Sequence, residues 1–441
     1  MSDSDRSLRI AVVGAGVSGL VSAAILSARH HVDLFESASH VGGHTRTLDV
    51  TIDGQSLPVD IGFMVFNRRT YRLFCRLLEL LRIPCRTSNM SFSVACERSG
   101  VVYQGSSWNG LFARRTNALR PRFYRMLVDI LRFHHQAAQR DDTSRTGETT
   151  ATLQEFLTRH RFSEEFRDLY LVPMTAAIWS TDQDRVLEMP ARFLLEFFRN
   201  HGLAQLRDRP VWYTIPGGAR RYVDALLAHG LMHVHTDCPV QAIERHETHV
   251  ALQTRQGWQP YDAVVLALPA DAAFSVLVDP SPDERRLLGA ITYQENRAVL
   301  HTDGRYLPQP ARAAASWNFR AARDSSRTTV TYWINRLQGL QSSRPLLVTL
   351  NPHQPISASH VLHETTFRHP VFDVQAWQAQ AALPTIQGQR RTYHCGAFWA
   401  NGFHEDGVRS AVQVAQQFGL DWEACIAACM KGTCGTGAGR P

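Results

Sequence analysis

Apolar and polar positions near the start of the chain follow the order strand, helix, strand. Arg9–Val13 is a short β-branched run of the kind that forms a buried parallel strand. Apolar residues then recur at helical spacing, at Leu20, Ala23, Ala24 and Leu26. A second apolar run, His31–Phe35, follows the helix. The pattern predicts a βαβ unit in a parallel sheet, and therefore an α/β fold class.

A glycine-rich turn separates the first strand from the helix. Gly14, Gly16 and Gly19 form the spacing G-x-G-x-x-G. Gly14 permits the tight turn, Gly16 leaves room for a pyrophosphate beside the backbone, and Gly19 lets the helix pack on the strand. The free N–H groups of the helix N-terminus favour the phosphate. We expect a Rossmann-like dinucleotide site around Gly14, Gly16, Val17, Ser18 and Gly19; the alternative is a glycine-rich turn in another α/β protein.

An acid and a second glycine pair follow the βαβ unit. Glu36, at the end of the second strand, can accept hydrogen bonds from the adenosine ribose. Val41–Thr47 resembles the signature G-G-[RH]-x-x-[ST] of the flavin amine oxidase superfamily. This superfamily includes monoamine oxidases, protoporphyrinogen oxidase and phytoene-type desaturases. The resemblance implies FAD, with contacts from Gly42, Gly43, His44 and Thr45. A plain NAD(P) dehydrogenase, which Glu36 would also suit, leaves the second glycine pair without a role.

Three later segments strengthen the resemblance. Asp60–Phe63 is similar to the D-x-G step that the superfamily places near the flavin ring, which implies contacts from Gly62 and Phe63. Cys238–Ile243 resembles the strand that contacts adenine, with Val240 at its centre. Ala263–Pro269 is typical of a buried strand that leads out of the FAD domain.

The segment from His394 to Gly407 resembles the last flavin contact of the superfamily. His394–Trp399 predicts a strand with an aromatic corner, and Gly402–Gly407 leads into a helix that we expect to begin at Gly407. Its N-terminus would stabilise negative charge on the reduced ring. The expected cofactor contacts are Gly396, Glu405, Asp406 and Gly407. Asp406 also suits N-terminal capping, which is the interpretation we prefer for its side chain.

The order of these segments predicts a discontinuous FAD-binding domain around a mixed α+β substrate domain. The first comprises residues 8–66, 205–269 and 390–420, and the second comprises residues 67–204 and 270–389. Residues 421–441 are expected to form a tail, whose Cys- and Gly-rich ending, Cys425–Pro441, is expected to be unstructured. The first part of the substrate domain has mainly helical patterns, including an apolar stripe at Phe123, Leu127, Ile130 and Leu131, a capping box at Thr152–Glu155, and a helix start at Pro190.

Short strands in the second part of the substrate domain predict a sheet that roofs the flavin. They are Tyr293–His301, Thr329–Asn335 and Leu346–Leu350. Tyr332 and Asn335 on this roof, and Phe398 and Trp399 at the aromatic corner, are the candidate substrate contacts. Alternation along the strand turns Tyr332 and Trp333 to opposite faces without deciding which one meets the flavin.

Composition sets limits on the other classes of protein. With 441 residues, 44% apolar and 20% charged, the chain is globular rather than disordered, collagenous, coiled-coil or disulfide-stapled. The net charge of +7 comes from scattered Arg, since Lys431 is the one Lys. Such a charge does not favour nucleic acid, and it suits contact with an anionic membrane surface or an acidic substrate equally well.

Cysteine usage and the N-terminus indicate the compartment. No two of the eight Cys form C-x-x-C, and most lie among apolar residues as in a reducing compartment. The spacing of Cys425, Cys429 and Cys434 fits no standard zinc pattern, so no metal is expected. Leu8–Ala28 has the length of a membrane span, but its three Gly and the acidic residues before it argue against one. We expect a cytoplasmic protein with, at most, peripheral membrane contact; the oligomeric state is not predicted.

Several motifs narrow the resemblance to a bacterial subgroup described as NAD/FAD-binding or amine-oxidase-like. Its members often occur beside cyclopropane-fatty-acid-synthase-type methyltransferases. The similarity extends from Ile10 to Leu420, and its motifs are Gly43–Thr45, Val59–Phe63, Asn89–Ser93, Tyr332–Gln338 and Gly402–Gly407.

Three hypotheses about the chemistry follow. The first is an FAD-dependent oxidoreductase, with non-covalent FAD, that takes hydride at flavin N5 from an apolar substrate such as a lipid acyl chain. The second is an amine oxidase, although the Lys that amine-oxidising members place near N5 has no counterpart before Lys431. The third is an FAD-binding isomerase or accessory protein without net redox turnover. No catalytic residue is predicted.

Overall fold

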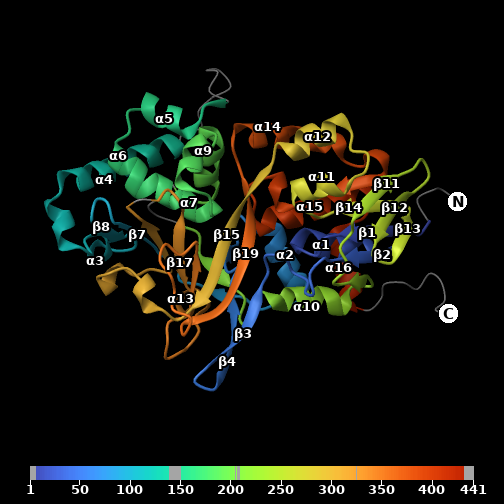
Figure 1. Ribbon diagram of the computed structural model, residues 1–441, viewed down its shortest axis with the longest axis horizontal. Helices are drawn as coiled ribbons and strands as arrows, with labels where there is room; N and C mark the ends of the chain where they lie inside the picture. The colour runs from blue at the N-terminus through green and yellow to red at the C-terminus, as the bar shows by residue number, and fades with distance from the viewer. Residues whose placement is uncertain (1–5, 139–149, 204, 206–208, 324, 432–441) are drawn as a thin grey trace.

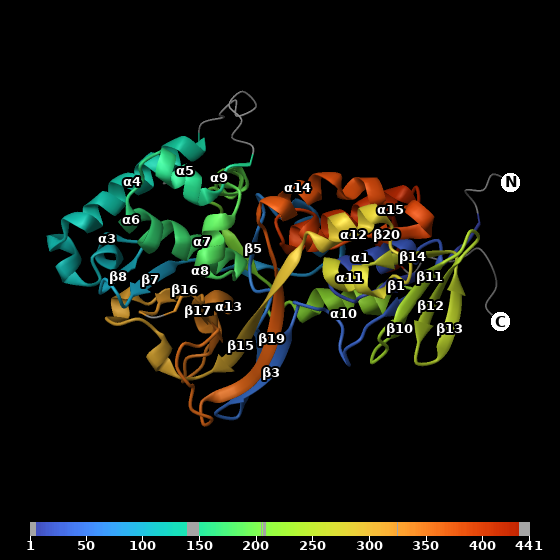
Figure 2. The ribbon, with the colours of Figure 1, turned by 45° about the horizontal axis from the view of Figure 1, so that its top comes forward.

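The computed structural model describes residues 6–138, 150–203, 205, 209–323 and 325–431. Two halves lie side by side along the long axis, with the N-terminus and the C-terminal helix α16 in one of them (Figures 1 and 2). The polar run Asp141–Thr150, whose composition predicts a loop, lies outside the described residues except for Thr150. Within the described ranges, no helix combines the length and hydrophobicity needed to cross a bilayer.

The first half is built on a five-stranded parallel sheet. The strand order is β10-β2-β1-β14-β20. The strands are β1 (Arg9–Val13), β2 (His31–Phe35), β10 (His233–His235), β14 (Ala263–Leu266) and β20 (Thr392–His394). They come from three distant stretches of the chain, and every pairing is parallel. The predicted Rossmann-like α/β fold is therefore confirmed, and its sheet is discontinuous in sequence.

Alternate residues of β1 face opposite sides of this sheet. Ile10 and Val12 are buried under helices, whereas Ala11 and Val13 are buried on the other face. The helices are α1 (Val17–Leu26), α2 (Arg72–Leu80), α10 (Arg220–His229), α15 (His404–Gln417) and α16 (Trp422–Lys431). The other face is covered by the antiparallel strands β11 (Ala242–Arg245), β12 (Val250–Thr254) and β13 (Gly257–Tyr261).

The second half contains a seven-stranded mixed sheet with helices beside it (Figure 2). Its order is β19-β15-β18-β17-β16-β7-β8. These strands are β7 (Phe92–Cys96), β8 (Val101–Gln104), β15 (Thr292–His301), β16 (Trp317–Ala321), β17 (Thr329–Trp333), β18 (Leu347–Leu350) and β19 (Val361–Val371). Its helices are α3 (Trp108–Leu111), α4 (Pro121–Ala138), α5 (Leu153–Arg159), α6 (Glu164–Phe166), α7 (Val172–Trp179), α8 (Gln183–Glu188) and α9 (Ala191–Asn200).

Shorter elements connect the halves. The strands are β3 (Thr47–Ile52), β4 (Gln55–Asp60), β5 (Phe66–Asn67), β6 (Arg86–Thr87) and β9 (Trp212–Thr214). The helices are α11 (Ala270–Val276), α12 (Pro282–Gly289), α13 (Ile334–Gln338) and α14 (Val374–Ala382). Single 3-10 or π turns are η2 (Arg115–Leu119), η5 (Arg167–Leu171), η6 (Gly304–Tyr306), η7 (Ala311–Ala313), η8 (Leu383–Ile386), η9 (Gln389–Arg391) and η10 (Ala397–Trp399).

Asp60, the last residue of β4, is hydrogen-bonded to three other segments of the chain. Its fully buried carboxylate accepts hydrogen bonds from Thr47 Oγ1 at 2.5 Å, from the Ala219 backbone N at 3.0 Å and from Gln338 Nε2 at 2.8 Å. Burial raises the pKa of Asp60 to about 7, which the donated hydrogen bonds oppose. Asp60 therefore holds the end of β4 to the start of β3, to the segment before α10 and to the end of α13.

Several predicted elements are confirmed and several are wrong. The capping box at Thr152 and the helix after Pro190 are present. The region from residue 67 to 201 contains strands as well as helices, and the strand predicted to end at Asn335 ends at Trp333, where α13 begins. Residues 238–241 form a loop before β11.

Two further corrections have packing causes. Leu131, predicted in the buried stripe of its helix, is 53% exposed, because Met126 and Phe133 turn inward instead. The tail predicted to be unstructured contains helix α16, whose Cys425, Ile426 and Cys429 are buried with the nucleotide-binding half. Cys434 lies outside the described residues.

Candidate cofactor and substrate site

The three glycines of the first turn have different surroundings. Gly14 has a φ of +100°, and a Cβ there would lie 2.6 Å from the Ala267 carbonyl oxygen. A Cβ on Gly19 would lie 1.8 Å from the Gly14 oxygen, which explains why this helix residue is glycine. A Cβ on Gly16 would meet no atom within 4 Å. The turn is thus tightly packed at Gly14 and Gly19 and open at Gly16.

The open position lies at the start of α1. Gly16 is the N-cap, and no side chain caps this terminus. The first N–H groups of a helix lack intrahelical partners and favour an anion. Free space and unsatisfied donors at one place fit a pyrophosphate.

The second glycine pair lies directly on the first turn. The backbone N of Gly42 donates to the Ala15 carbonyl oxygen at 2.8 Å. Gly43, with a φ of +56°, approaches so closely that a Cβ would lie 3.1 Å from Gly16 Cα. Gly43 and His44 nevertheless keep exposed surface. The open side of Gly16 therefore continues along this second loop, as an elongated cofactor requires.

The last helix also meets the first turn. A Cβ on Gly407 would lie 2.7 Å from Val17 Cγ1 and 2.9 Å from Ser18 Oγ, so α15 lies against the start of α1 (Figure 1). Farther along α15, Ser410 Oγ accepts a hydrogen bond from the Gly396 backbone N at 2.9 Å. Segments separated by almost four hundred residues thus meet at the start of α1, and we call the open strip along Gly16 and Gly43 the glycine-lined groove.

Glu36 ties the first glycine turn to the segment that follows β2. One carboxylate oxygen accepts a hydrogen bond from the Ala15 backbone N and the other from the Ala38 backbone N, both at 2.9 Å. The Glu36 carbonyl oxygen accepts from the Cys238 backbone N, which brings half-buried Val240 near the end of β2. Glu36 and Val240 therefore lie at one end of the groove, and the carboxylate keeps lone pairs for further donors.

Five residues, four of them predicted, gather beside the second glycine loop. The Phe63 and His404 rings stack with centroids 3.6 Å apart, and His404 Nε2 is hydrogen-bonded to Thr45 Oγ1 at 2.9 Å. Desolvation lowers the pKa of His404 to about 3, so the imidazole is neutral. The Phe63 backbone N donates to the His44 carbonyl oxygen, and a Cβ on Gly62 would lie 2.1 Å from that oxygen. Sequence reasoning missed His404, although it lies inside the motif that identified the last helix.

The two acids of α15 hold protein elements in place. Glu405 accepts hydrogen bonds from the backbone N atoms of Leu73 at 3.1 Å and Phe74 at 3.0 Å, in the first turn of α2. Asp406 accepts from the Phe403 backbone N at 3.1 Å, which forms a capping box from inside the helix. The helix therefore begins at His404 rather than at Gly407. Burial raises the pKa of Asp406 to about 6. The geometry agrees with the preferred capping interpretation.

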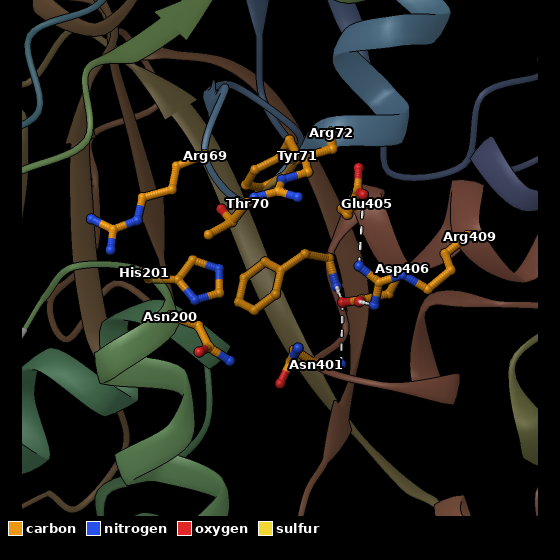
Figure 3. A pocket seen from close by; sticks show the side chains of 11 residues that line it. Arg69, Thr70, Tyr71, Arg72, Asn200, His201, Asn401, Glu405, Asp406 and Arg409 are labelled. Atoms are coloured by element: carbon orange, nitrogen blue, oxygen red, sulfur yellow. Dashed lines mark hydrogen bonds and ion pairs between the residues drawn. The ribbon is translucent and has the colours of Figure 1, made fainter. Parts of the chain in front are cut away.

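A cavity of about 330 Å³ opens beside Phe403 (Figure 3). It is lined by Arg69, Thr70, Tyr71, Arg72, Asn200, His201, Asn401, Phe403, Glu405, Asp406 and Arg409. Arg409 lies 3.6 Å from Glu405 and 3.2 Å from Asp406, whereas no carboxylate of the described residues pairs with Arg69 or Arg72. Among the described residues, the cavity thus has two guanidinium groups, those of Arg69 and Arg72, without a carboxylate partner.

Aromatic side chains of the second half form the apolar wall behind Phe403. Its ring centroid lies 5.4 Å from that of Phe197 and 6.0 Å from that of Trp179. His201 stacks on Phe197 at 3.8 Å, and burial lowers the pKa of His201 to about 4. These residues come from α7, α9 and the loop before α15, so no local motif indicated them.

The four candidate substrate residues lie elsewhere. Phe398 is buried in a separate core with α12 and α14, and Trp399 packs against the same core. Tyr332 is buried 4.9 Å from Trp317, between ring centroids. Asn335 Oδ1 accepts from the Leu346 backbone N at 2.6 Å, which ties α13 to the next strand. Their described contacts are with the core and not with the cavity beside Phe403.

The fold and the groove together define a class of protein. A parallel sheet, an open Gly16 at an uncapped helix N-terminus, a second glycine loop and a final helix that closes on them are the features of a flavin-binding dinucleotide fold. The residues present fit the flavin cofactor that the sequence motifs imply.

The family follows from direct comparison. The model of the flavin containing amine oxidoreductases matches residues 17–341, so the chain belongs to this family. AofH of Mycobacterium tuberculosis, named as a flavin-containing monoamine oxidase, is 26% identical over 284 residues, which are 62% of this chain and 59% of AofH. The matched region thus spans less than two thirds of that relative. The predicted superfamily is confirmed, whereas the narrower bacterial subgroup stays a prediction.

Solved structures share the fold across almost the whole chain. A fatty acid isomerase from P. acnes that produces CLA has a TM-score of 0.67 and 16% identity, and covers 95% of this chain and 100% of its own. Cyclohexylamine oxidase from Brevibacterium oxydans IH-35A has a TM-score of 0.66 and 16% identity, and covers 97% and 100%. At these identities the similarity establishes the fold alone.

Proposed function

We propose that the protein holds FAD non-covalently in the glycine-lined groove and oxidises an apolar substrate with an anionic head, of the fatty acyl class. The observation that carries this proposal is the pair Arg69 and Arg72, which have no carboxylate partner within the described ranges, in the cavity beside Phe403. A bound flavin accepts hydride at N5, so the protein's part is to orient the substrate and exclude water.

Charge in the cavity separates an acid from an amine. Arg409 is paired with Glu405 and Asp406, so the charges that remain for a ligand are positive. A carboxylate would gain charge-assisted hydrogen bonds from Arg69 or Arg72, whereas an ammonium group would be repelled. Phe403, which packs on the buried rings of Phe197 and Trp179, supplies apolar surface in the cavity lining.

Amine oxidation is the second candidate. Membership of the amine oxidoreductase family and the fold shared with cyclohexylamine oxidase favour it. The fold shared with a fatty acid isomerase favours an acyl substrate, with or without net oxidation. The one Lys, Lys431, ends α16 and is absent from the cavity lining.

Non-covalent attachment is supported by the surroundings of Cys395. Its fully buried Sγ lies 3.6 Å from Ser22 Oγ beneath α1, and burial raises the pKa of the thiol to about 12. Such a thiol is not a nucleophile toward the cofactor. Heat or acid should therefore release all of the flavin.

Anaerobic spectroscopy tests the proposal. Long-chain fatty acids should bleach the flavin absorbance, and simple primary amines should not. Arg72→Gln should raise the fatty acid Kd by about tenfold, the loss of one charge-assisted hydrogen bond. Arg68→Gln is the matched control, because Arg68 stacks on Tyr213 and does not line the cavity.

Each other outcome selects an alternative. Bleaching by amines alone would replace the proposal with amine oxidation. Tight fatty acid binding with no bleaching, and conversion of the added acid to an isomer, would favour an isomerase. Absence of fatty acid binding in protein that retains flavin would reject the acyl class altogether.

A further inference from the structure

Most of the net charge of the chain arises in one segment. Residues 98–132 contain seven Arg and one acid, Asp129, which gives +6, whereas the whole chain carries +7. Asp129 is buried and accepts hydrogen bonds from Ser163. Asp129 also pairs with Arg132 at 2.5 Å, and among the described residues the other acid that pairs with these Arg is Glu165, 3.4 Å from Arg122. A charge that looks diffuse over the chain is thus concentrated here.

Several guanidinium groups in this segment are held by neutral acceptors. Arg114 donates to the Gly100 carbonyl oxygen at 2.6 Å, and Arg120 donates to the Ser99 carbonyl oxygen at 2.8 Å. Arg115 donates to the Phe112 carbonyl oxygen at 3.1 Å. Carbonyl groups orient these side chains and leave their positive charge available.

Exposed apolar side chains accompany the charge. Of the eleven exposed large apolar residues in the described part of the chain, five lie between residues 108 and 131. They are Trp108 (78% exposed), Leu119 (83%), Tyr124 (45%), Val128 (56%) and Leu131 (53%). Exposed apolar side chains and the excess of Arg therefore occur in the same segment of the chain.

These side chains belong to one face. Tyr124, Val128 and Leu131 are spaced four and three residues apart, so they share one side of α4. The Tyr124 hydroxyl donates to the Ala118 carbonyl oxygen at 3.0 Å, which joins η2 to α4. Phe112, just after α3, lies 6.3 Å from Tyr124 between ring centroids. We call the exposed side of α3, η2 and α4 the α3–α4 face.

The position of the α3–α4 face leaves it free of the nucleotide-binding half. Helices α3 and α4 lie at the far end of the second half, opposite the chain termini, in both views (Figures 1 and 2). Binding at this face would leave the glycine-lined groove uncovered. What binds at the α3–α4 face is therefore independent of the proposed substrate.

We infer that the α3–α4 face docks on a bilayer surface that contains anionic lipid. On this face, guanidinium groups alternate with single apolar side chains, as they do on helices that lie in the lipid interface. They do not surround one continuous apolar patch. Trp and Tyr side chains suit the headgroup level, and Arg without acidic neighbours suits anionic headgroups. Because the outward apolar area is small, binding depends on charge and weakens with salt.

Vesicle co-sedimentation of the flavin-loaded protein tests this inference. Wild type should bind vesicles of phosphatidylcholine mixed with phosphatidylglycerol at least about tenfold more tightly than vesicles of phosphatidylcholine alone. High salt should remove the difference. The double variant Arg115→Ser/Arg125→Ser and the double variant Trp108→Ser/Leu119→Ser should each weaken binding about tenfold.

A matched control lies at the opposite end of the molecule. Arg255→Ser/Trp258→Ser removes an exposed Arg and a 45%-exposed Trp from the β12–β13 hairpin, and should bind as wild type does. Equal flavin content in all variants shows that each is folded. Equal binding to both vesicles, or equal loss in the control, would overturn the inference. So would self-association without lipid that the α3–α4 substitutions abolish, because the face would then bind a second copy.

Discussion

The glycine-lined groove and the cavity beside Phe403 are built from different kinds of residue. The cofactor groove is lined by residues whose side chains are absent or small, Gly16, Gly43 and Gly407, and its donors are backbone groups. The cavity beside Phe403 is lined by large side chains from separate elements, such as Phe403 and Arg72, and Phe197 lies behind Phe403. The groove therefore leaves a signature along the chain, whereas the cavity exists only after folding. The variants below probe this difference in order of expected effect.

Gly19→Ala should have the largest effect. Its Cβ would lie 1.8 Å from the Gly14 backbone oxygen, which cannot move aside as a flexible side chain could. Overpacking a core typically costs about 1–3 kcal/mol of unfolding free energy. We expect Gly19→Ala to lose more than this, and to lose bound flavin as well. Thermal unfolding and flavin content measure both effects. Gly289→Ala is the control, because its Cβ meets nothing within 4 Å; equal stability of the two variants would contradict the packing argument.

Two carboxylates tie C-terminal helices to α2, and they should differ sharply. Glu405→Ala leaves two buried N–H groups of α2 without an acceptor and should cost about 3 kcal/mol of unfolding free energy. Glu423→Ala breaks an exposed pair with Arg76 and should cost less than about 1 kcal/mol. Urea unfolding measures both values. Similar losses of unfolding free energy in the two variants would mean that Glu405 does not hold α15 to α2.

Acid should destabilise the second half through its buried imidazoles. His301 is fully buried, its Nδ1 accepts from the Asp303 backbone N, and burial lowers its pKa to about 4. The unfolded chain binds a proton below about pH 6.5 and the folded chain does not, so stability falls as pH falls from 6.5 toward 4.

The advantage of wild type over His301→Gln should therefore shrink by about 2 kcal/mol between pH 7 and pH 5. Urea unfolding at the two pH values measures this change. Exposed His31→Gln is the control, whose difference from wild type should not change between them. A constant difference for His301→Gln would show that this imidazole is not held neutral.

The smallest effect is expected at the pair Arg220 and Asp49. The contact is bidentate, at 2.9 and 3.0 Å, but both side chains are about half exposed. A double-mutant cycle with Arg220→Ala and Asp49→Ala should give a coupling free energy below about 1 kcal/mol. A larger coupling would show that this surface pair, and not buried Asp60 alone, holds α10 to β3.

The sequence predicted backbone features of the groove, but it did not predict the cavity beside Phe403. Gly14, Gly16 and Gly19 could be assigned roles from spacing alone, because each role is a constraint on the backbone. The start of α15 could not, since Asp406 caps the helix from its third position.

The cavity and the last helix show why the rest was missed. Phe403 becomes a cavity wall only because α7 and α9 bring Trp179 and Phe197 beside it. The spacing of Cys425, Ile426 and Cys429 already suited a buried helical face, but the glycine-rich ending suggested an unstructured tail. Long-range packing decided both cases.

The flavin content of Gly16→Val tests the central claim most directly. Because nothing lies within 4 Å of a Cβ at this position, the variant should fold and unfold as wild type does, but its added methyl groups would occupy the space of the pyrophosphate. Gly289→Val is the matched control and should be fully yellow. We predict a folded, colourless Gly16→Val protein; full FAD occupancy in that variant would contradict the account.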